Sequence, residues 1–184
     1  MSYIKDVINE YRPKVIEEEI RFLSTHRYGE PSIWDRVVKG SYYGKKLRPI
    51  LAIETYKALT GEDDIISESI SVELLHRASL FQDDVIDRDT LRRGEPTFHR
   101  ELLSHFEDEW NAESAAICYG NLLANLGKVP VLESDIENEK KVRILELFTE
   151  AENKLNEGEI MDIYPVSYTH LRAHETRHDL VCRL

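Results

Sequence analysis

Several features are scarce in this sequence of 184 residues, and each scarcity excludes a class of protein. Only two cysteines occur, Cys118 and Cys182, which is too few for a disulfide framework. No apolar run approaches the length of a membrane span, and the polar start does not resemble a secretory signal. We therefore expect a cytoplasmic protein without a membrane span.

Glycine and proline are also scarce, with 8 and 6 residues, and strand-like alternation is absent. Apolar residues instead recur at helical spacing, and the chain is long enough to bury a core. These patterns predict an all-α fold, with helices near 3–24, 32–39, 48–60, 65–87, 99–107, 111–126 and 135–163.

Basic residues are in the minority, so the formal net charge is -11. This excess of negative charge disfavours nucleic acid as a partner. Neither a G-x-S-x-G motif nor a Ser-His-Asp order is present, so the sequence does not indicate a hydrolase with a serine nucleophile. We expect a site for small anions only where basic residues gather locally.

Three of the four aspartates in the segment FQDDVIDRDTLRRG, at 81–94, lie at the end of a predicted helix. Asp83 and Asp87 are four residues apart and project from one face of that helix, with Asp84 about 100° round the axis. Carboxylates at a helix C-terminus repel the dipole and one another unless a cation joins them. Mg2+ suits this pattern, because it binds one or two carboxylates together with substrate phosphates.

Two arginines, Arg92 and Arg93, follow the aspartates directly. Guanidinium groups pair bidentately with phosphate oxygens, so the segment as a whole resembles a site for a metal ion and a diphosphate. The alternative is a solvated helix end, in which the aspartates only form ion pairs with Arg88, Arg92 and Arg93.

A second basic segment, YGKKLRP at 43–49, lies upstream. Gly44 can take backbone angles closed to other residues, and Pro49 suits the first turn of the next helix. Lys45 and Arg48 then flank a helix N-terminus, where exposed N–H groups and the positive end of the dipole favour a phosphate. The alternative is a basic loop with no ligand.

Three segments occur in the order GKKLRP, ELLHRASLFQDDVID and TLRRGEPTFH. They resemble the first half of the trans-isoprenyl diphosphate synthases, the polyprenyl synthetases, and the resemblance covers roughly residues 1–165. Tyr43 replaces the first glycine of the family's GGKxxRP motif. Gln82 stands where many members have histidine, and Asn121 replaces the aspartate of a GDxLLA helix.

The resemblance implies a helical bundle of the isoprenoid-synthase type. It also implies a prenyltransferase, working as a homodimer, that joins isopentenyl diphosphate to an allylic diphosphate with the help of Mg2+. Asp83 and Asp87 would ligate the metal with help from Asp84, and Arg92 would hold the allylic diphosphate. Isopentenyl diphosphate would be held by Lys45, Arg48, His76 and Arg93. The alternative for His76 is a histidine of the core whose ring nitrogens are hydrogen-bonded within the protein.

Two small residues, Ala78 and Ser79, precede the aspartates by about one turn of the same helix. A substrate tail would run from the aspartates toward the helix N-terminus, so these residues are candidates for the floor of a chain-length pocket. In the family a bulky aromatic there stops elongation early, which predicts longer products for this protein. Alternatively, a large side chain on another helix closes the pocket first.

The last segment, residues 166–184, loses the helical pattern and contains His170, His174 and His178. It resembles a translated sequencing adapter, so we expect a non-native tail. A histidine-rich metal tract is the alternative. Residues 1–165 would then be the N-terminal portion of a polyprenyl synthetase domain.

The family's second aspartate-rich motif is expected well beyond residue 165 and is not present. Because the family takes carboxylates from two facing helices, we expect the parent gene to encode a prenyltransferase and this chain to be a truncated, inactive fragment. A non-catalytic diphosphate-binding subunit is the alternative from another class. A terpene cyclase is less favoured, because GKKLRP and RRG imply a second diphosphate.

Overall fold

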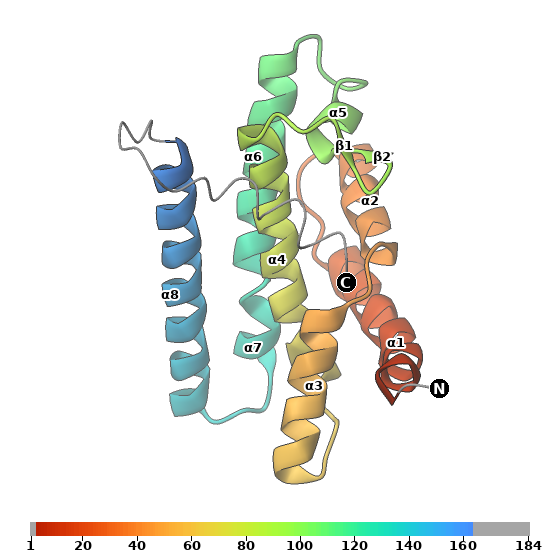
Figure 1. Ribbon diagram of the computed structural model, residues 1–184, viewed down its shortest axis with the longest axis vertical. Coiled ribbons are helices and arrows are strands. Elements are labelled where there is room, and N and C mark those ends of the chain that lie inside the picture. Colours follow the sequence, from red (N-terminus) through yellow and green to blue (C-terminus); the bar gives the residue numbers. More distant parts are fainter. Residues whose placement is uncertain (1–2, 164–184) are drawn as a thin grey trace, which may run out of the picture. The chain divides into compact units, whose positions relative to one another are not determined.

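The computed structural model describes residues 3–163 (Figure 1). The chain divides into two units, residues 1–141 and 142–184. The predicted all-α fold is confirmed, and the described elements run in the following order. They are α1 (Tyr3–Thr25), α2 (Pro31–Lys39), the 3-10 helix η1 (Gly40–Tyr42), α3 (Leu47–Thr60), α4 (Ile66–Ile86), β1 (Leu91–Arg92), β2 (Glu95–Pro96), α5 (Phe98–Leu102), α6 (Glu109–Leu126), α7 (Val129–Glu133) and α8 (Asn138–Ile163).

The observed elements differ from the predicted ones only in short segments. The helix expected over 99–107 is confined to α5, and α7 forms where no helix is predicted, with Pro130 in its first turn. A two-stranded antiparallel hairpin, β1 and β2, is also present. The sequence does not predict it, because two residues per strand are too few to show alternation.

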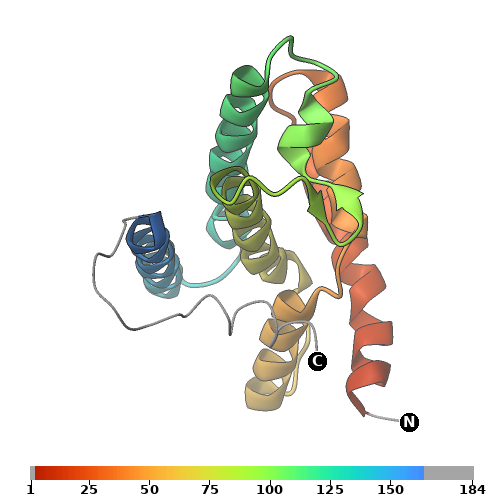
Figure 2. The ribbon, with the colours of Figure 1, turned by 45° about the horizontal axis from the view of Figure 1, so that its top comes forward.

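Helix α4 is central to the first unit and contacts α1, α3, α5, α6 and α7 (Figure 1). Figure 2 shows α1, α3 and α6 gathered around it. The apolar stripe of α4 places Ile70, Leu74 and Ala78 in the core, as its helical spacing predicts. Helix α6 approaches closely at Gly120, where a Cβ atom would lie 3.2 Å from the Ala78 carbonyl oxygen.

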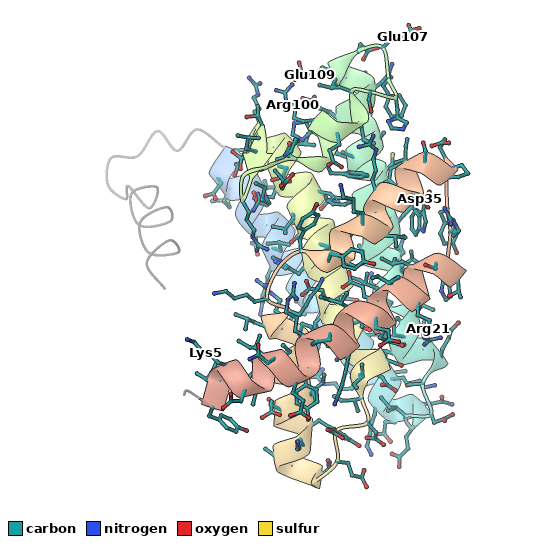
Figure 3. The ribbon with its side chains drawn as sticks, turned by 90° about the vertical axis from the view of Figure 1, so that its right-hand side faces the viewer. Lys5, Arg21, Asp35, Arg100, Glu107 and Glu109 are labelled. Carbon is teal, nitrogen blue, oxygen red and sulfur yellow. The ribbon has the colours of Figure 1, made fainter. Side chains whose placement is uncertain are left out.

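Polar contacts connect the ends of neighbouring helices. Trp34 of α2 is fully buried, and its indole N–H donates to the Leu23 carbonyl oxygen near the end of α1, at 2.8 Å. Arg100 of α5 forms an ion pair of 2.6 Å with Glu109 of α6, and the two side chains lie close together in Figure 3. Glu109 is in the first turn of α6, where the helix dipole favours a negative charge.

The described part of the second unit, 142–163, is a stretch of α8. None of the residues of α8 is buried. Its charged side chains pair along the helix, Arg143 with Glu146 at 3.0 Å and Lys154 with Glu150 at 2.6 Å. Exposed pairs of this kind contribute little to the free energy of unfolding.

No helix within residues 3–163 is both long and apolar enough to cross a membrane. The segment 166–184, expected to be a non-native tail, lies outside the described residues. Its assignment therefore stays a prediction.

Candidate active site

The paired carboxylates Asp83 and Asp87 lie where α4 ends. Asp87 is the C-cap residue, and its N–H donates to the Asp83 carbonyl oxygen at 2.8 Å, so the helical spacing extends to both residues. Asp83 is half-buried and Asp87 is exposed. The two carboxylates are therefore one helical turn apart at an accessible helix end.

The end of α4 has the hydrogen bonds of a Schellman motif. The Arg88 N–H donates to the Val85 carbonyl oxygen at 3.2 Å, and the Asp89 N–H donates to the Asp84 carbonyl oxygen at 2.9 Å. Arg88 has a φ of 57°, in the left-handed position that glycine most often occupies. This turn directs the chain away from the aspartates and into the hairpin.

The β1–β2 hairpin brings Arg92 back over the aspartates. Arg93 and Gly94 have φ values of 57° and 87°, the two positive angles that a type I′ turn requires. Arg92 then donates from Nη2 to Asp83 Oδ2 at 2.7 Å and from Nε to Asp84 Oδ1. Arg92 also lies 3.7 Å from Asp89, so it pairs with three aspartates, and the alternative of a solvated helix end expects such contacts as well.

Asp84 differs from the paired aspartates in its burial, since only 3% of its surface is exposed. Burial raises the pKa of Asp84 to about 6, although the hydrogen bond from Arg92 acts in the opposite direction. Asp84 is thus placed to anchor Arg92 from inside, while Asp83 and Asp87 are the more accessible carboxylates.

The second basic segment forms the start of α3. Gly44 and Lys46 have φ values of 84° and 54°, and no side chain caps the helix N-terminus. The N–H groups of Leu47 and Arg48 are therefore available to an anion, whereas Pro49 has no N–H group. Lys45 and Arg48 are exposed at this end, and neither forms an ion pair with a carboxylate within the described residues.

The two basic segments meet where Arg93 lies against Gly44. A Cβ atom at Gly44 would be 3.0 Å from a terminal guanidinium nitrogen of Arg93. The cations of this region act on His76 of α4: burial lowers its pKa to about 4, and the charges of Arg48 and Arg93 act in the same direction. His76 is therefore neutral at pH 7, and the structure brings it together with cations from α3 and the hairpin.

Sequence reasoning missed two residues that support this loop. Lys46 is buried, and its Nζ donates to Glu19 at 2.7 Å and to Glu73 at 3.0 Å. Arg12 of α1 donates to two backbone carbonyl oxygens of the loop, each at 2.9 Å. Nothing in the sequence around Lys46 indicates that it is buried. Glu19 could have indicated a buried ion pair, because it is an acidic residue within the apolar stripe of α1.

Two departures from the family's pattern contact each other. Gln82 of α4 donates from Nε2 to Oδ1 of Asn121 on α6, at 2.9 Å. The contact joins the two helices beside the aspartates through neutral side chains.

The two chain-length candidates occupy different sides of α4. Ala78 is 3% exposed and belongs to the core, with its carbonyl oxygen close to Gly120 of α6. Ser79 is half-buried, and its hydroxyl donates to the His76 carbonyl oxygen at 2.8 Å. At about 100° per residue, Ser79 lies nearer the face of Asp83 than Ala78 does.

The donor set at the end of α4 suits a hard cation. In the part of the chain that the structure describes, no three histidine, cysteine, aspartate or glutamate side chains are arranged to hold a metal by themselves. The pair Asp83 and Asp87 supplies carboxylate oxygens only. Mg2+ fits such a pair, because it keeps several waters and completes its octahedron with substrate phosphates.

Comparison with known proteins identifies the relatives of this chain. The family model described as polyprenyl synthetase matches residues 35–183. Geranylgeranyl pyrophosphate synthase 4 of Arabidopsis thaliana is 36% identical over 103 residues, which are 54% of this chain and 25% of that protein. A short chain isoprenyl diphosphate synthase of Methanocaldococcus jannaschii is 32% identical over 122 residues, which are 65% of this chain and 34% of that protein.

A solved structure has the same fold. Geranylgeranyl pyrophosphate synthetase from Pyrococcus horikoshii Ot3 aligns with a TM-score of 0.70 and 27% identity, over 88% of this chain and 48% of that one. The fold and the site thus define a helical protein with paired carboxylates beside basic residues from two segments, the hairpin and the start of α3. Within that class, the chain belongs to the polyprenyl synthetase family. It spans less than half of the length of each of these relatives.

Proposed function

We propose that the protein is a trans-prenyltransferase that condenses isopentenyl diphosphate with an allylic diphosphate. The observation that supports this most is a carboxylate site with cations at two separate positions. Arg92 lies over the aspartates, while Arg93 and Arg48 lie around the start of α3, together with the neutral His76. Two diphosphates need two such cationic positions, whereas a terpene cyclase needs one.

In this proposal Asp83 and Asp87 hold Mg2+, and Asp84 keeps Arg92 in place from the buried side. Mg2+ bound there would act as a Lewis acid on the leaving diphosphate. Arg92 would exchange its contact with Asp83 for the allylic diphosphate, since guanidinium pairs equally well with phosphate oxygens.

The second diphosphate would bind at the N-terminus of α3. Lys45 and Arg48 supply positive charge, and the uncapped N–H groups supply hydrogen bonds. Neutral His76 can donate one ring N–H to a phosphate oxygen without needing a proton from solvent. Arg93 would close this site from the hairpin, where it already lies against Gly44.

The reaction would need no nucleophilic side chain. The allylic C–O bond breaks, the double bond of isopentenyl diphosphate forms a new C–C bond with the resulting cation, and a proton is lost. The protein's residues hold the two substrates in line and offset the charge on the departing diphosphate.

The family also leads us to expect a cytoplasmic homodimer. Light scattering can test the dimer, and cell fractionation can test the location.

The test uses protein expressed from its full reading frame, with isopentenyl and allylic diphosphates. We expect a longer prenyl diphosphate with Mg2+ and none in excess chelator. The double variant Asp83→Ala with Asp87→Ala should lose several orders of magnitude in activity, because the leaving diphosphate loses its metal anchor. Full activity in chelator or in this variant would refute the metal assignment.

The same assay separates the alternatives. A cyclic or linear hydrocarbon made from the allylic diphosphate alone would indicate a terpene cyclase. Diphosphate binding without turnover, restored only by a second polypeptide, would indicate a non-catalytic subunit.

A further inference from the structure

Four buried charges meet beneath the loop that carries Lys45. Lys46 Nζ contacts Glu19 of α1 at 2.7 Å and Glu73 of α4 at 3.0 Å, and Arg77 of α4 pairs with the other oxygen of Glu19. All four side chains are less than 10% exposed. Two cations and two anions balance, which is what allows such charges to be buried. We call these four residues, Glu19, Lys46, Glu73 and Arg77, the buried charge network.

The network is attached to the loop at both ends. On one side Arg77 donates to the Val37 carbonyl oxygen and, at 3.0 Å, to the Ser41 hydroxyl, which connects it to α2 and η1. A Cβ atom at Gly40 would collide with its guanidinium, so the glycine provides the space that Arg77 needs. On the other side Lys46 is itself the residue before α3.

Lys46 is held in an uncommon backbone conformation. Its φ of 54° and ψ of 36° lie in the left-handed region, which costs a residue with a side chain about 1 kcal/mol or more. Glu19 and Glu73 hold the ammonium group of Lys46 in the interior. Because Lys46 points inward, its neighbours Lys45 and Arg48 are left on the exposed side at the start of α3.

Arg12 reinforces the same loop from α1. Its Nε donates to the Gly44 carbonyl oxygen and its Nη2 to the Tyr42 carbonyl oxygen, each at 2.9 Å. Arg12 and Glu19 are seven residues apart, which places them on one face of α1 two turns apart. One helix therefore holds both the start and the end of the loop.

We infer that Lys46 is a positioning residue: through the buried charge network it fixes the loop that presents Lys45 and Arg48 to the second diphosphate. The inference rests on the proposed function, because it assigns a purpose to the geometry of that diphosphate site. Lys46 itself does not touch the substrate, since its ammonium group is fully buried.

The experiment measures binding of inorganic diphosphate by calorimetry, without divalent cation, so that the aspartates contribute little. We expect Lys46→Met to weaken binding about tenfold or more, comparable to losing one charge-assisted hydrogen bond. In the enzyme from the full reading frame, the KM for isopentenyl diphosphate should rise by a similar factor while the KM for the allylic diphosphate changes little.

A second variant separates positioning from stability. Lys46→Met leaves a buried glutamate without a partner, which lowers the melting temperature whatever the role of the residue. The double variant Lys46→Met with Glu73→Met keeps the Glu19–Arg77 pair, so the network is again neutral. We expect its melting temperature to recover in part while its affinity for diphosphate stays low, because the loop still lacks its anchor.

Tyr11→Phe is the matched control. Tyr11 is fully buried and connects α1 to the far end of α3 through Lys57 at 2.9 Å and to the loop after α3 through Asp63 at 2.6 Å. We expect this variant to melt earlier and to bind diphosphate normally, with all binding measured below each variant's transition.

Three results would overturn the inference. Unchanged binding by folded Lys46→Met, or recovery of binding together with stability in the double variant, would refute the positioning role of Lys46. Either result would leave the second diphosphate site in place. A failure of the unaltered protein to bind inorganic diphosphate would remove both the second diphosphate site and the inference.

Discussion

At the scale of single residues, three basic residues close to the site have left-handed backbone angles. They are Lys46, Arg88 and Arg93, with φ values of 54°, 57° and 57°. Lys46 is held by the buried charge network and Arg93 by the hairpin, whereas Arg88 occupies a position that glycine fills more readily. Replacing each of the three is therefore expected to change the free energy of unfolding in a different way.

Arg88→Gly should stabilise the protein. The replacement removes the clash of the Cβ atom with the backbone in the left-handed region, so the free energy of unfolding should rise by about 1 kcal/mol in a urea titration. Arg88→Ala is the matched control, because it removes the guanidinium but keeps the Cβ atom, and it should not gain. Equal changes in the two variants would show that strain at Arg88 is not the cause.

His76 should make stability depend on pH. Its ordinary pKa of 6.5 is lowered to about 4 in the folded protein, mainly by burial. Between these values the unfolded chain binds more protons, so the free energy of unfolding should fall as the pH drops from 6.5 towards 4. Above that range both states are neutral at this residue and the effect vanishes.

The measurement compares wild type with His76→Asn, which cannot take up the proton. The difference in the free energy of unfolding between the two proteins should change between pH 4 and 6.5 and be constant above pH 7. A difference that is constant over the whole range would contradict the burial of a neutral His76.

At the scale of helices, α4 and α6 are joined beside the aspartates by the hydrogen bond from Gln82 to Asn121. A double-mutant cycle with Gln82→Ala and Asn121→Ala should give a coupling energy of about 0.5–1 kcal/mol, typical of a partly exposed neutral pair. Asn125 is exposed one turn further along α6, so Gln82→Ala and Asn125→Ala should be additive. Additivity in the first pair as well would show that the contact contributes no stability.

At the scale of the whole molecule, the proposed function predicts that product length depends on which side chain closes the substrate pocket first. We propose Ser79 as part of the floor, because it lies nearer the face of Asp83 and is not part of the buried core. If the protein is the proposed prenyltransferase, Ser79→Phe should shorten its product, measured by chromatography of the dephosphorylated alcohols.

Ala78→Phe serves as the comparison. Ala78 is 3% exposed and faces α6, so a phenyl ring there should overpack the interface and lower the melting temperature by more than Ser79→Phe does. Unchanged product length in the folded Ser79→Phe variant would place the floor on another helix.

The sequence by itself determined what depends on local spacing. The i, i+4 relation of Asp83 and Asp87 follows from a helix over 65–87, and the structure has that helix to within one residue. The apolar stripe of α4 also predicted the burial of Ile70, Leu74 and Ala78, because burial on a helix repeats every 3.6 residues. The motifs around these residues indicated a family that the comparisons confirm.

Only the tertiary structure decided which distant residues meet. The contact of Arg93 with Gly44 depends on a hairpin whose strands are too short to leave a pattern, and the burial of Lys46 depends on glutamates 27 residues away on either side. Lys45 and Lys46 are adjacent and chemically identical, yet one is exposed and the other is fully enclosed. Local periodicity cannot distinguish them, because the difference arises from the packing of α1 and α4 around the loop.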